Sequence, residues 1–431
     1  MSREENRKNF SKYVSQNILG MIGFSCYVLA DSYFISIAKG ADGLTALNLV
    51  MPLYSIIFSI GEMIGVGSAI RYAIGKIKKD ADADDYFWNA IIWCILSSIL
   101  FVFAGIFFSA DIMRVLGADE HIVAVGNNYT KIFMCFAPMF MCNYVTNAFV
   151  RNDGAPGIAM SATLFSSLFN IVFDYILMFP MKLGMEGAAL ATALSPIIGM
   201  GICSIHFFSK KSSVRLVVCK PSVRKLVAGS QLGVSAFVGE MSSAVITLAF
   251  NFVILKLAGN VGVAAYGVVA NIAIVTTAVF NGVAQGSQPL ISSCFGRGDN
   301  DGCTQLKRMG YTTAFVLAAV MYSILFIFAG QFVAVFNSEG SEMLRIYATE
   351  GVKLYFIGIF FAGINIVGGG AFSATENAFK AAVVSVARGF VLILGAVFVM
   401  SALFGMTGVW LAYAVAEGIT TFIMLVMALR V

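Results

Sequence analysis

The chain has 431 residues, of which 59% are hydrophobic and 12% are charged. Its mean hydropathy is +0.86, and its charged share is roughly half of the ~25% that is usual for soluble domains. So few polar residues cannot cover a soluble protein of this size, which excludes a soluble enzyme, a nucleic-acid-binding protein and a secreted disulfide scaffold. The net charge of +5 therefore requires no nucleic acid, and the lipid bilayer is the partner we expect.

Twelve apolar stretches are long enough to cross a bilayer as helices, which takes about 20 residues each. We expect spans at 13–37, 44–72, 86–108, 122–150, 158–179, 186–208, 227–256, 263–293, 310–335, 346–372, 381–402 and 407–430. The longest polar connection, at about 209–226, is too short to form a soluble domain. The expected fold class is therefore an all-α integral membrane protein.

The distribution of basic residues predicts the orientation of these spans. Of the 28 Lys and Arg residues, 21 fall on the side of the two termini. The other seven are Lys39, Arg114, Lys131, Lys182, Lys256, Arg345 and Lys353. Because Lys and Arg concentrate in cytoplasmic loops, we expect a multi-pass protein of the cell (plasma or inner) membrane with both termini in the cytoplasm. This count assigns Arg388 to the cytoplasmic side and leaves no basic residue deep in a span.

The two halves of the chain resemble each other. Residues 184–193 recur at 405–414 with six identities in ten, and Gly40 corresponds to Gly259. Six spans in each half is an even number, so the halves run in the same direction and are related by an axis along the membrane normal. We expect two six-helix lobes, 1–215 and 216–431, with this pseudo-two-fold relation. The arrangement suits a transporter, although the symmetry alone would also fit a channel or a scaffold.

Three polar residues of the first half are expected at nearly one depth inside the membrane, with two more on the helical faces of the aspartates. Asp31, Asp174 and Thr192 lie at similar distances from the outer ends of their spans. Tyr27 and Asn170 each precede one of the aspartates by four residues and so share its helical face. Ionisable residues within a span are costly and usually functional. These groups could bind a proton or Na⁺, and the candidate Na⁺ ligands are Asp31, Asn170, Asp174 and Thr192.

The second half does not repeat this cluster. The counterparts of Asp31, Asn170 and Asp174 are Phe250, Val391 and Gly395. A purely structural cluster would be expected in both copies of a duplicated lobe. The sequence therefore confines the coupling chemistry to the first half.

Three further carboxylates lie within expected spans. Glu240 is midway along its span, and we interpret it as a contact for a substrate or cation; Glu62 and Glu417 are weaker candidates for the same role. Each could instead be a structural carboxylate bonded within the helix bundle. The sequence contains no phosphate-binding loop and no H-E-x-x-H motif, so we expect neither an enzyme nor a cofactor.

The sequence resembles the multidrug and toxin extrusion (MATE) family across essentially its whole length. The stretches that carry the resemblance are 29–35 (LADSYFI), 149–156 (FVRNDGAP), 170–174 (NIVFD) and 184–189 (GMEGAA). The aspartates of spans 1 and 5 are similar to those of the bacterial DinF-like branch, which implies that Tyr27, Asp31, Asn170, Asp174 and Thr192 take the coupling ion.

The chain departs from the family pattern in two places. Gln16 stands where relatives of this branch commonly have a proline in span 1. Span 10 offers Asn365 but no mid-span carboxylate, so the second-lobe cation site of the NorM-like branch is not reproduced beside Glu240.

The resemblance implies a monomeric secondary antiporter that exports small organic compounds, cationic and amphipathic, in exchange for H⁺ or Na⁺. The alternative within the same superfamily is a flippase for lipid-linked precursors. A flippase would need a strongly cationic cavity to hold phosphates, and the sequence places no Lys or Arg where it could line one.

Overall fold

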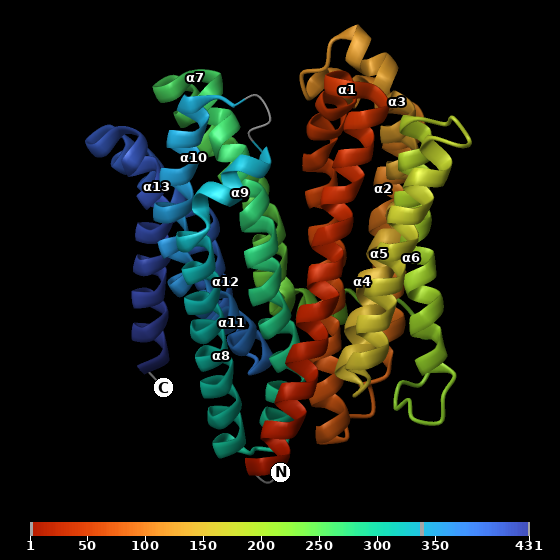
Figure 1. Ribbon diagram of the computed structural model, residues 1–431. Coiled ribbons are helices and arrows are strands. Elements are labelled where there is room, and N and C mark those ends of the chain that lie inside the picture. Colours follow the sequence, from red (N-terminus) through yellow and green to blue (C-terminus); the bar gives the residue numbers. More distant parts are fainter. Residues whose placement is uncertain (1–2, 337–339, 430–431) are drawn as a thin grey trace. The chain divides into compact units, whose positions relative to one another are not determined.

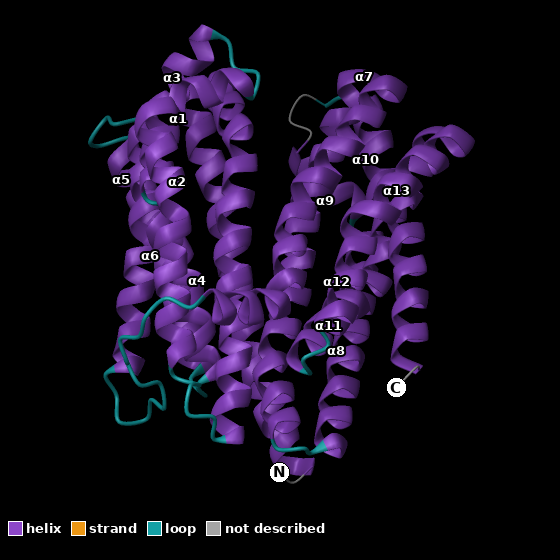
Figure 2. Cartoon of the chain, turned by 180° about the vertical axis from the view of Figure 1, so that it is seen from behind, coloured by secondary structure: helices purple, strands orange, loops and turns teal. Residues whose placement is uncertain are grey.

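The computed structural model describes residues 3–336 and 340–429, and all regular structure within them is helical (Figure 2). The helices of the first half are α1 (Arg3–Lys78), α2 (Asp85–Val115), α3 (Glu120–Cys135), α4 (Ala137–Asn152), α5 (Pro156–Met178) and α6 (Met185–Phe207). Those of the second half are α7 (Val223–Gly296), α8 (Asn300–Ile327), α9 (Ala329–Phe336), α10 (Glu342–Tyr355), α11 (Ile359–Ala374), α12 (Ala378–Val386) and α13 (Leu392–Leu429). Short 3₁₀ and π turns, Phe356–Gly358 and Ala387–Val391, precede α11 and α13.

These helices accommodate all twelve expected spans. Helix α1 contains two spans that meet at Gly40, α7 contains two that meet at Gly259, and 378–428 contains two that meet at Gly405. Helices α3 and α4 meet at an angle of 46° and together form the expected span 122–150. The last residue of the expected span 407–430 lies outside the described residues.

Glycines at matching positions of the two halves adopt matching backbone angles. Gly40 (φ 58°, ψ −142°) corresponds to Gly259 (φ 61°, ψ −157°), and Gly184 (φ 53°, ψ −126°) corresponds to Gly405 (φ 60°, ψ −137°). A β-carbon makes this region of backbone space strongly unfavourable, so only glycine adopts it readily. The duplicated sequence motif is thus also a duplicated turn between consecutive spans.

The chain folds into two compact units. We call Ser15–Glu240 with Ser292–Asp299 the first unit, and Met1–Val14, Met241–Ile291 and Asn300–Val431, as far as they are described, the second unit. These units differ from the expected halves 1–215 and 216–431, because α1 and α7 each contribute residues to both. Within the first unit, α5 and α6 run side by side (Figure 1).

The beginning of α7 joins the first unit through close contact between glycines. A β-carbon on Gly233 would lie 1.9 Å from the backbone oxygen of Met63, and one on Gly67 would lie 2.0 Å from that of Gly229. Small residues let two membrane helices approach to backbone contact in this way. This packing carries Glu240 into the same unit as Glu62.

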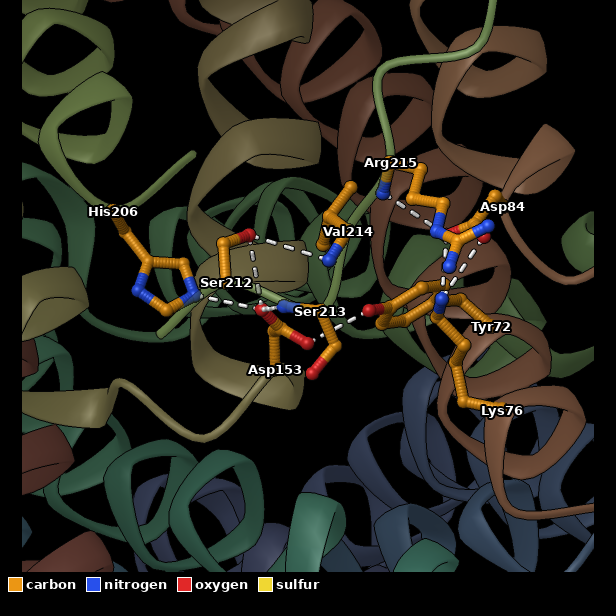
Figure 3. A network of polar contacts seen from close by, with 9 residues as sticks. All are labelled: Tyr72, Lys76, Asp84, Asp153, His206, Ser212, Ser213, Val214 and Arg215. Carbon is orange, nitrogen blue, oxygen red and sulfur yellow. Dashed lines mark hydrogen bonds and ion pairs between the residues drawn. The ribbon is translucent and has the colours of Figure 1, made fainter. Parts of the chain in front are cut away.

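The start of the linker between α6 and α7 is held to the rest of the first unit by the carboxylate of Asp153, whose side chain is buried (Figure 3). The Tyr72 hydroxyl donates to its Oδ1 (2.7 Å), and His206 Nε2 lies 2.7 Å from its Oδ2. The Ser213 backbone N–H (2.8 Å) and the Ser212 hydroxyl (3.3 Å) also donate to Oδ2. Asp153 therefore joins the ends of α4 and α6 and the linker at one point.

A second carboxylate, Asp84, holds the next part of the linker. It accepts from the Arg215 backbone N–H (3.1 Å) and from Lys76 Nζ (2.9 Å). Farther along, the Ser222 backbone N–H donates to Asn89 Oδ1 (2.7 Å). The linker is thus bonded to the first unit near both of its ends.

Asp153→Ala should release the start of the linker. A hydrogen bond to a charged group contributes about 1.5–3 kcal/mol, so losing even one should raise the population of the open linker roughly tenfold or more. We expect limited trypsin digestion at Lys210, Lys211 and Arg215 to accelerate by at least that factor. Ser212→Ala removes two long hydrogen bonds, one to Asp153 Oδ2 (3.3 Å) and one from the Val214 backbone N–H (3.2 Å). It is the graded control and should accelerate digestion less than Asp153→Ala, which loses all four contacts of the carboxylate. Equal digestion rates for Asp153→Ala and the unmodified protein would contradict this role of Asp153.

Candidate functional site

Two aspartates are buried together in the first unit. Asp31 of α1 and Asp174 of α5 expose 6% and 0% of their surface, and they lie close enough to interact electrostatically. Two carboxylates in an apolar bundle repel each other and lose their hydration, so their burial is costly unless another group compensates. The structure thus brings together the two residues that sequence depth had placed in one layer.

Asn170 and Thr192 join this pair. Both are buried, and the Asn170 amide lies 3.1 Å from Thr192 Oγ1. With its nitrogen turned toward Asp174, the amide also donates to Asp174 Oδ2 over 3.1 Å, while its oxygen accepts from Thr192 Oγ1. Between α5 and α6, which pack on each other, a chain of hydrogen bonds therefore runs from Asp174 through Asn170 to Thr192.

Tyr27 completes the predicted set. It lies one turn before Asp31 on α1 and is close enough to interact electrostatically with Asp31, Asp174 and Glu240. We call Tyr27, Asp31, Asn170, Asp174 and Thr192 the carboxylate cluster. All five lie in the first unit.

The carboxylate cluster has unfilled acceptors. Asp31 Oδ1 and Asp174 Oδ1 are buried and accept no hydrogen bond from any described residue. A buried oxygen without a partner is destabilising, and a proton or a monovalent cation would supply what is missing. No group of three His, Cys, Asp or Glu residues within the described ranges could hold a metal ion, so a cation here would also need the Asn170 and Thr192 oxygens.

Two tyrosines that sequence reasoning missed lie near the carboxylate cluster. The hydroxyls of Tyr54 and Tyr129 are 2.5 Å apart, and the Tyr54 ring stacks on Phe133 with 3.7 Å between centroids. Both tyrosines interact electrostatically with Asp31 and Asp174. Nothing in their sequence spacing relates them to the aspartates, because the contact arises from the packing of α3 on α1.

Glu62 and Glu240 form a second acidic pair in the first unit. Glu62 is 8% exposed and Glu240 is half-buried, and the two lie close enough to interact electrostatically. Arg151, itself buried, interacts with Glu62 and has its Nη1 atom 3.4 Å from Asn17 Oδ1. The sequence treated Glu62 and Glu240 as separate candidates, and the packing of α7 on α1 brings them together.

Glu417 lies in the second unit and has a partner that the sequence did not predict. Arg388 Nη2 donates to Glu417 Oε1 over 2.7 Å, and its Nε donates to the same oxygen over 3.0 Å. The expectation that no basic residue lies deep in a span is therefore wrong. Arg388 is eight residues beyond Lys380, which is about 12 Å along a helix, and counting by loops assigned it to the membrane surface.

The counterparts of the carboxylate cluster in the second unit carry no charge. Phe250 is fully buried and stacks on Tyr266 with 5.1 Å between ring centroids. Val391 is exposed, and a β-carbon on Gly395 would meet nothing within 4 Å. The second unit therefore has a different polar site, centred on Glu417.

Comparisons with known proteins agree with this architecture. The MatE family model matches residues 17–176 and 236–399. The multidrug export protein MepA of Staphylococcus aureus (strain MRSA252) is 27% identical over 414 residues, covering 93% of this chain and 89% of MepA. MepA of Staphylococcus saprophyticus is 26% identical over 410 residues, with the same coverage of both chains.

Solved structures share the fold. An outward-facing multidrug resistance MATE family transporter of the MOP superfamily superposes with a TM-score of 0.92 at 20% identity, over 99% of this chain and 96% of its own. A MOP superfamily transporter from Pyrococcus furiosus, described as having a binding pocket of reversed polarity, superposes with a TM-score of 0.91 at 19% identity, over 99% and 95%. The expected all-helical membrane fold of two six-helix lobes is confirmed.

Proposed function

Because the chain belongs to the multidrug and toxin extrusion (MATE) family of membrane transporters, we propose that it is a secondary antiporter that exports organic cations of amphipathic character in exchange for H⁺ or Na⁺. The relatives named as multidrug export proteins support the substrate class. The observation that carries the proposal is the buried pair Asp31 and Asp174, each with an oxygen that lacks a hydrogen-bond partner among the described residues.

In this account the carboxylate cluster is where the driving ion binds. An entering H⁺ or Na⁺ neutralises part of the charge shared by Asp31 and Asp174 and is held by the oxygens of Asn170 and Thr192. A ligand shifts a conformational equilibrium only through its different affinity for the two states. Removing the repulsion between the two carboxylates changes the relative energies of states in which they are closer or farther apart. Cation entry would thereby favour release of the exported compound.

The substrate contacts that we propose are the remaining carboxylates. Glu62 and Glu240 lie together in the first unit, so an organic cation between them would face two negative groups. Glu417 is the candidate of the second unit. Arg388 already forms an ion pair with it, so a cationic substrate would contact Glu417 only where that pair opens.

The flippase alternative needs free positive charge to hold the phosphates of a lipid-linked precursor. Among the described residues, Arg388 is bonded to Glu417, and Arg151 interacts with Glu62. Because the buried guanidinium of Arg151 and the half-buried one of Arg388 both lie beside carboxylates, these observations favour the export of cations over the transfer of phosphorylated lipids.

We also propose the arrangement of the chain in the membrane: a monomer of the plasma membrane with both termini and the 209–226 connection in the cytoplasm. The excess of Lys and Arg on that side supports this orientation.

Asp31→Asn and Asp174→Asn should each reduce gradient-driven export at least tenfold, while the protein stays folded and binds its substrate. Asparagine keeps the shape of aspartate but cannot gain and lose the charge that links cation entry to the conformational change. The measurement is transport in proteoliposomes beside equilibrium binding of the same compound, at pH 6 and pH 8. Wild-type transport rates in both variants would show that the cluster is structural.

Two further variants distinguish the coupling ions. Asn170→Ala and Thr192→Ala should cause partial losses of transport, and these should be larger for Na⁺ coupling, because a coordinated metal ion needs more oxygen ligands than a proton. The two variants serve as graded controls for Asp31→Asn, since neither changes a charge.

Glu240→Gln should weaken the binding of a cationic compound by about tenfold and leave a neutral compound of similar size nearly unchanged. The substitution removes one charge and little volume, and a charge-assisted hydrogen bond contributes about 1.5–3 kcal/mol, of which about 1.4 kcal/mol corresponds to a factor of ten. Equilibrium binding to purified protein tests this. Equal effects on both compounds would leave Glu240 with a structural role only.

A single cysteine introduced at Ser212 or Lys220 should be labelled only from the cytoplasmic side. The background is a variant whose eight native cysteines are replaced, and an impermeant maleimide is applied to intact cells and then to opened cells. Labelling in intact cells would reverse the proposed topology.

A further inference from the structure

The second unit contains an ion pair within its helices. Arg388 lies in the π turn Ala387–Val391, and Glu417 lies in α13. The Glu417 side chain is 3% exposed and that of Arg388 is 16% exposed. Nη2 and Nε of the guanidinium both donate to Oε1, at 2.7 and 3.0 Å, and Nε also donates to Oε2 over 3.3 Å. Such charge-assisted contacts are among the strongest hydrogen bonds in proteins.

Other polar groups surround the carboxylate of Glu417. The Asn365 amide nitrogen donates to its Oε2 (2.7 Å) and to the Glu417 backbone oxygen (2.9 Å). The Thr421 hydroxyl donates to Asn365 Oδ1 (3.0 Å) and so fixes the orientation of the amide. Glu417 thus lies in a built site for a positive group, and the chain supplies the positive group itself.

The backbone at Arg388 is irregular. Residues Ala387–Val391 form a π-helical turn between α12 and α13. Such a turn contains one residue more than an α-helical turn, and π turns within helices are frequent at functional sites. The extra residue rotates Arg388 relative to the regular helix 392–404 that follows it, and the break at Gly405 leads to the last span, on which Glu417 lies.

The internal repeat relates this site to the carboxylate cluster. With the offset of 221 residues, Tyr413 is the counterpart of Thr192, and it lies close enough to Arg388 and Glu417 to interact with both electrostatically. Equivalent positions of the two halves therefore both line polar sites. In the first unit the neighbours of Asp174 are Asn170 and a second carboxylate, Asp31, whereas in the second unit the carboxylate faces a guanidinium.

We propose that Arg388 is a tethered cation that occupies a binding site for organic cations formed by Glu417 and Asn365. The proposal rests on the proposed function, in which the chain carries organic cations. Arg388 keeps this site closed to them, so it sets the charge that the second unit presents to a substrate. Removing the guanidinium leaves a buried carboxylate without its counter-charge, which is strongly unfavourable, and an organic cation entering where Arg388 is exposed would restore the balance.

The test compares two probes of similar size and opposite charge, tetraphenylphosphonium and tetraphenylborate, in equilibrium binding to purified protein at one detergent concentration. Arg388→Gln should bind tetraphenylphosphonium at least tenfold more tightly than the unmodified protein. Glu417→Gln leaves the guanidinium without its carboxylate and should instead gain affinity for tetraphenylborate. The double variant has neither charge and should gain affinity for neither probe.

Lys380→Gln is the matched control. Lys380 lies in the same unit at the end of the same pair of helices, where its Nζ donates to the Met427 backbone oxygen (2.8 Å). The variant loses one positive charge as Arg388→Gln does, but away from Glu417, and its affinity for tetraphenylphosphonium should not change. A gain equal to that of Arg388→Gln would mean that total charge rather than the Glu417 site attracts the probe, and would overturn the proposal.

Unchanged tetraphenylphosphonium affinity in a folded Arg388→Gln protein would also overturn it, because the pair would then be structural. If Arg388→Gln does not fold, Glu417→Gln decides the matter, and no gain for tetraphenylborate rejects the proposal. These readouts need no ion gradient. Loss of transport in Asp31→Asn therefore leaves the result unaffected, and failure of the antiport proposal can be told apart from failure of this one.

Discussion

The cost of a charge inside an apolar helix bundle is the constraint on which this structure depends. A charged side chain at the centre of a bilayer costs at least about 2.5–3.5 kcal/mol even on the most permissive scales. The two units compensate this cost in different ways. Glu417 is neutralised by Arg388, whereas Asp31 and Asp174 face each other and retain oxygens without a partner among the described residues. The carboxylate of Glu417 already has its counter-ion, whereas the Asp31–Asp174 pair can bind and release a cation.

This difference arose within a duplicated scaffold. The paired glycines Gly40 and Gly259, and Gly184 and Gly405, turn the chain in the same way in each half. Because such turns restrict the backbone and not the neighbouring side chains, the helices between them were free to diverge. Phe250 now packs on Tyr266 where the first half has Asp31. Duplication thus preserved the architecture and left the two polar sites to acquire separate roles.

The sequence predicted the fold almost completely, because long apolar runs mark the membrane helices and glycines mark the turns between them. It also predicted the carboxylate cluster, since depth counted from the helix ends places Asp31, Asp174 and Thr192 in one layer, and four-residue spacing puts Tyr27 and Asn170 on the faces of the two aspartates. It missed Arg388, because each basic residue was assigned to the nearest loop although Arg388 lies about eight residues inside a span. It missed the pairing of Glu62 with Glu240 and of Tyr54 with Tyr129, since these contacts depend on which faces of different helices meet, which spacing within one helix does not specify.

The central claim is that export is driven by a cation that enters in exchange. The most direct measurement is the counterflow itself: proteoliposomes with an internal pH indicator or Na⁺ indicator, without an imposed gradient, to which an exported compound is added on one side. The account predicts that the movement of the compound drives H⁺ or Na⁺ in the opposite direction, and that Asp31→Asn eliminates this counterflow. Movement of the compound with no flux of either ion would contradict it.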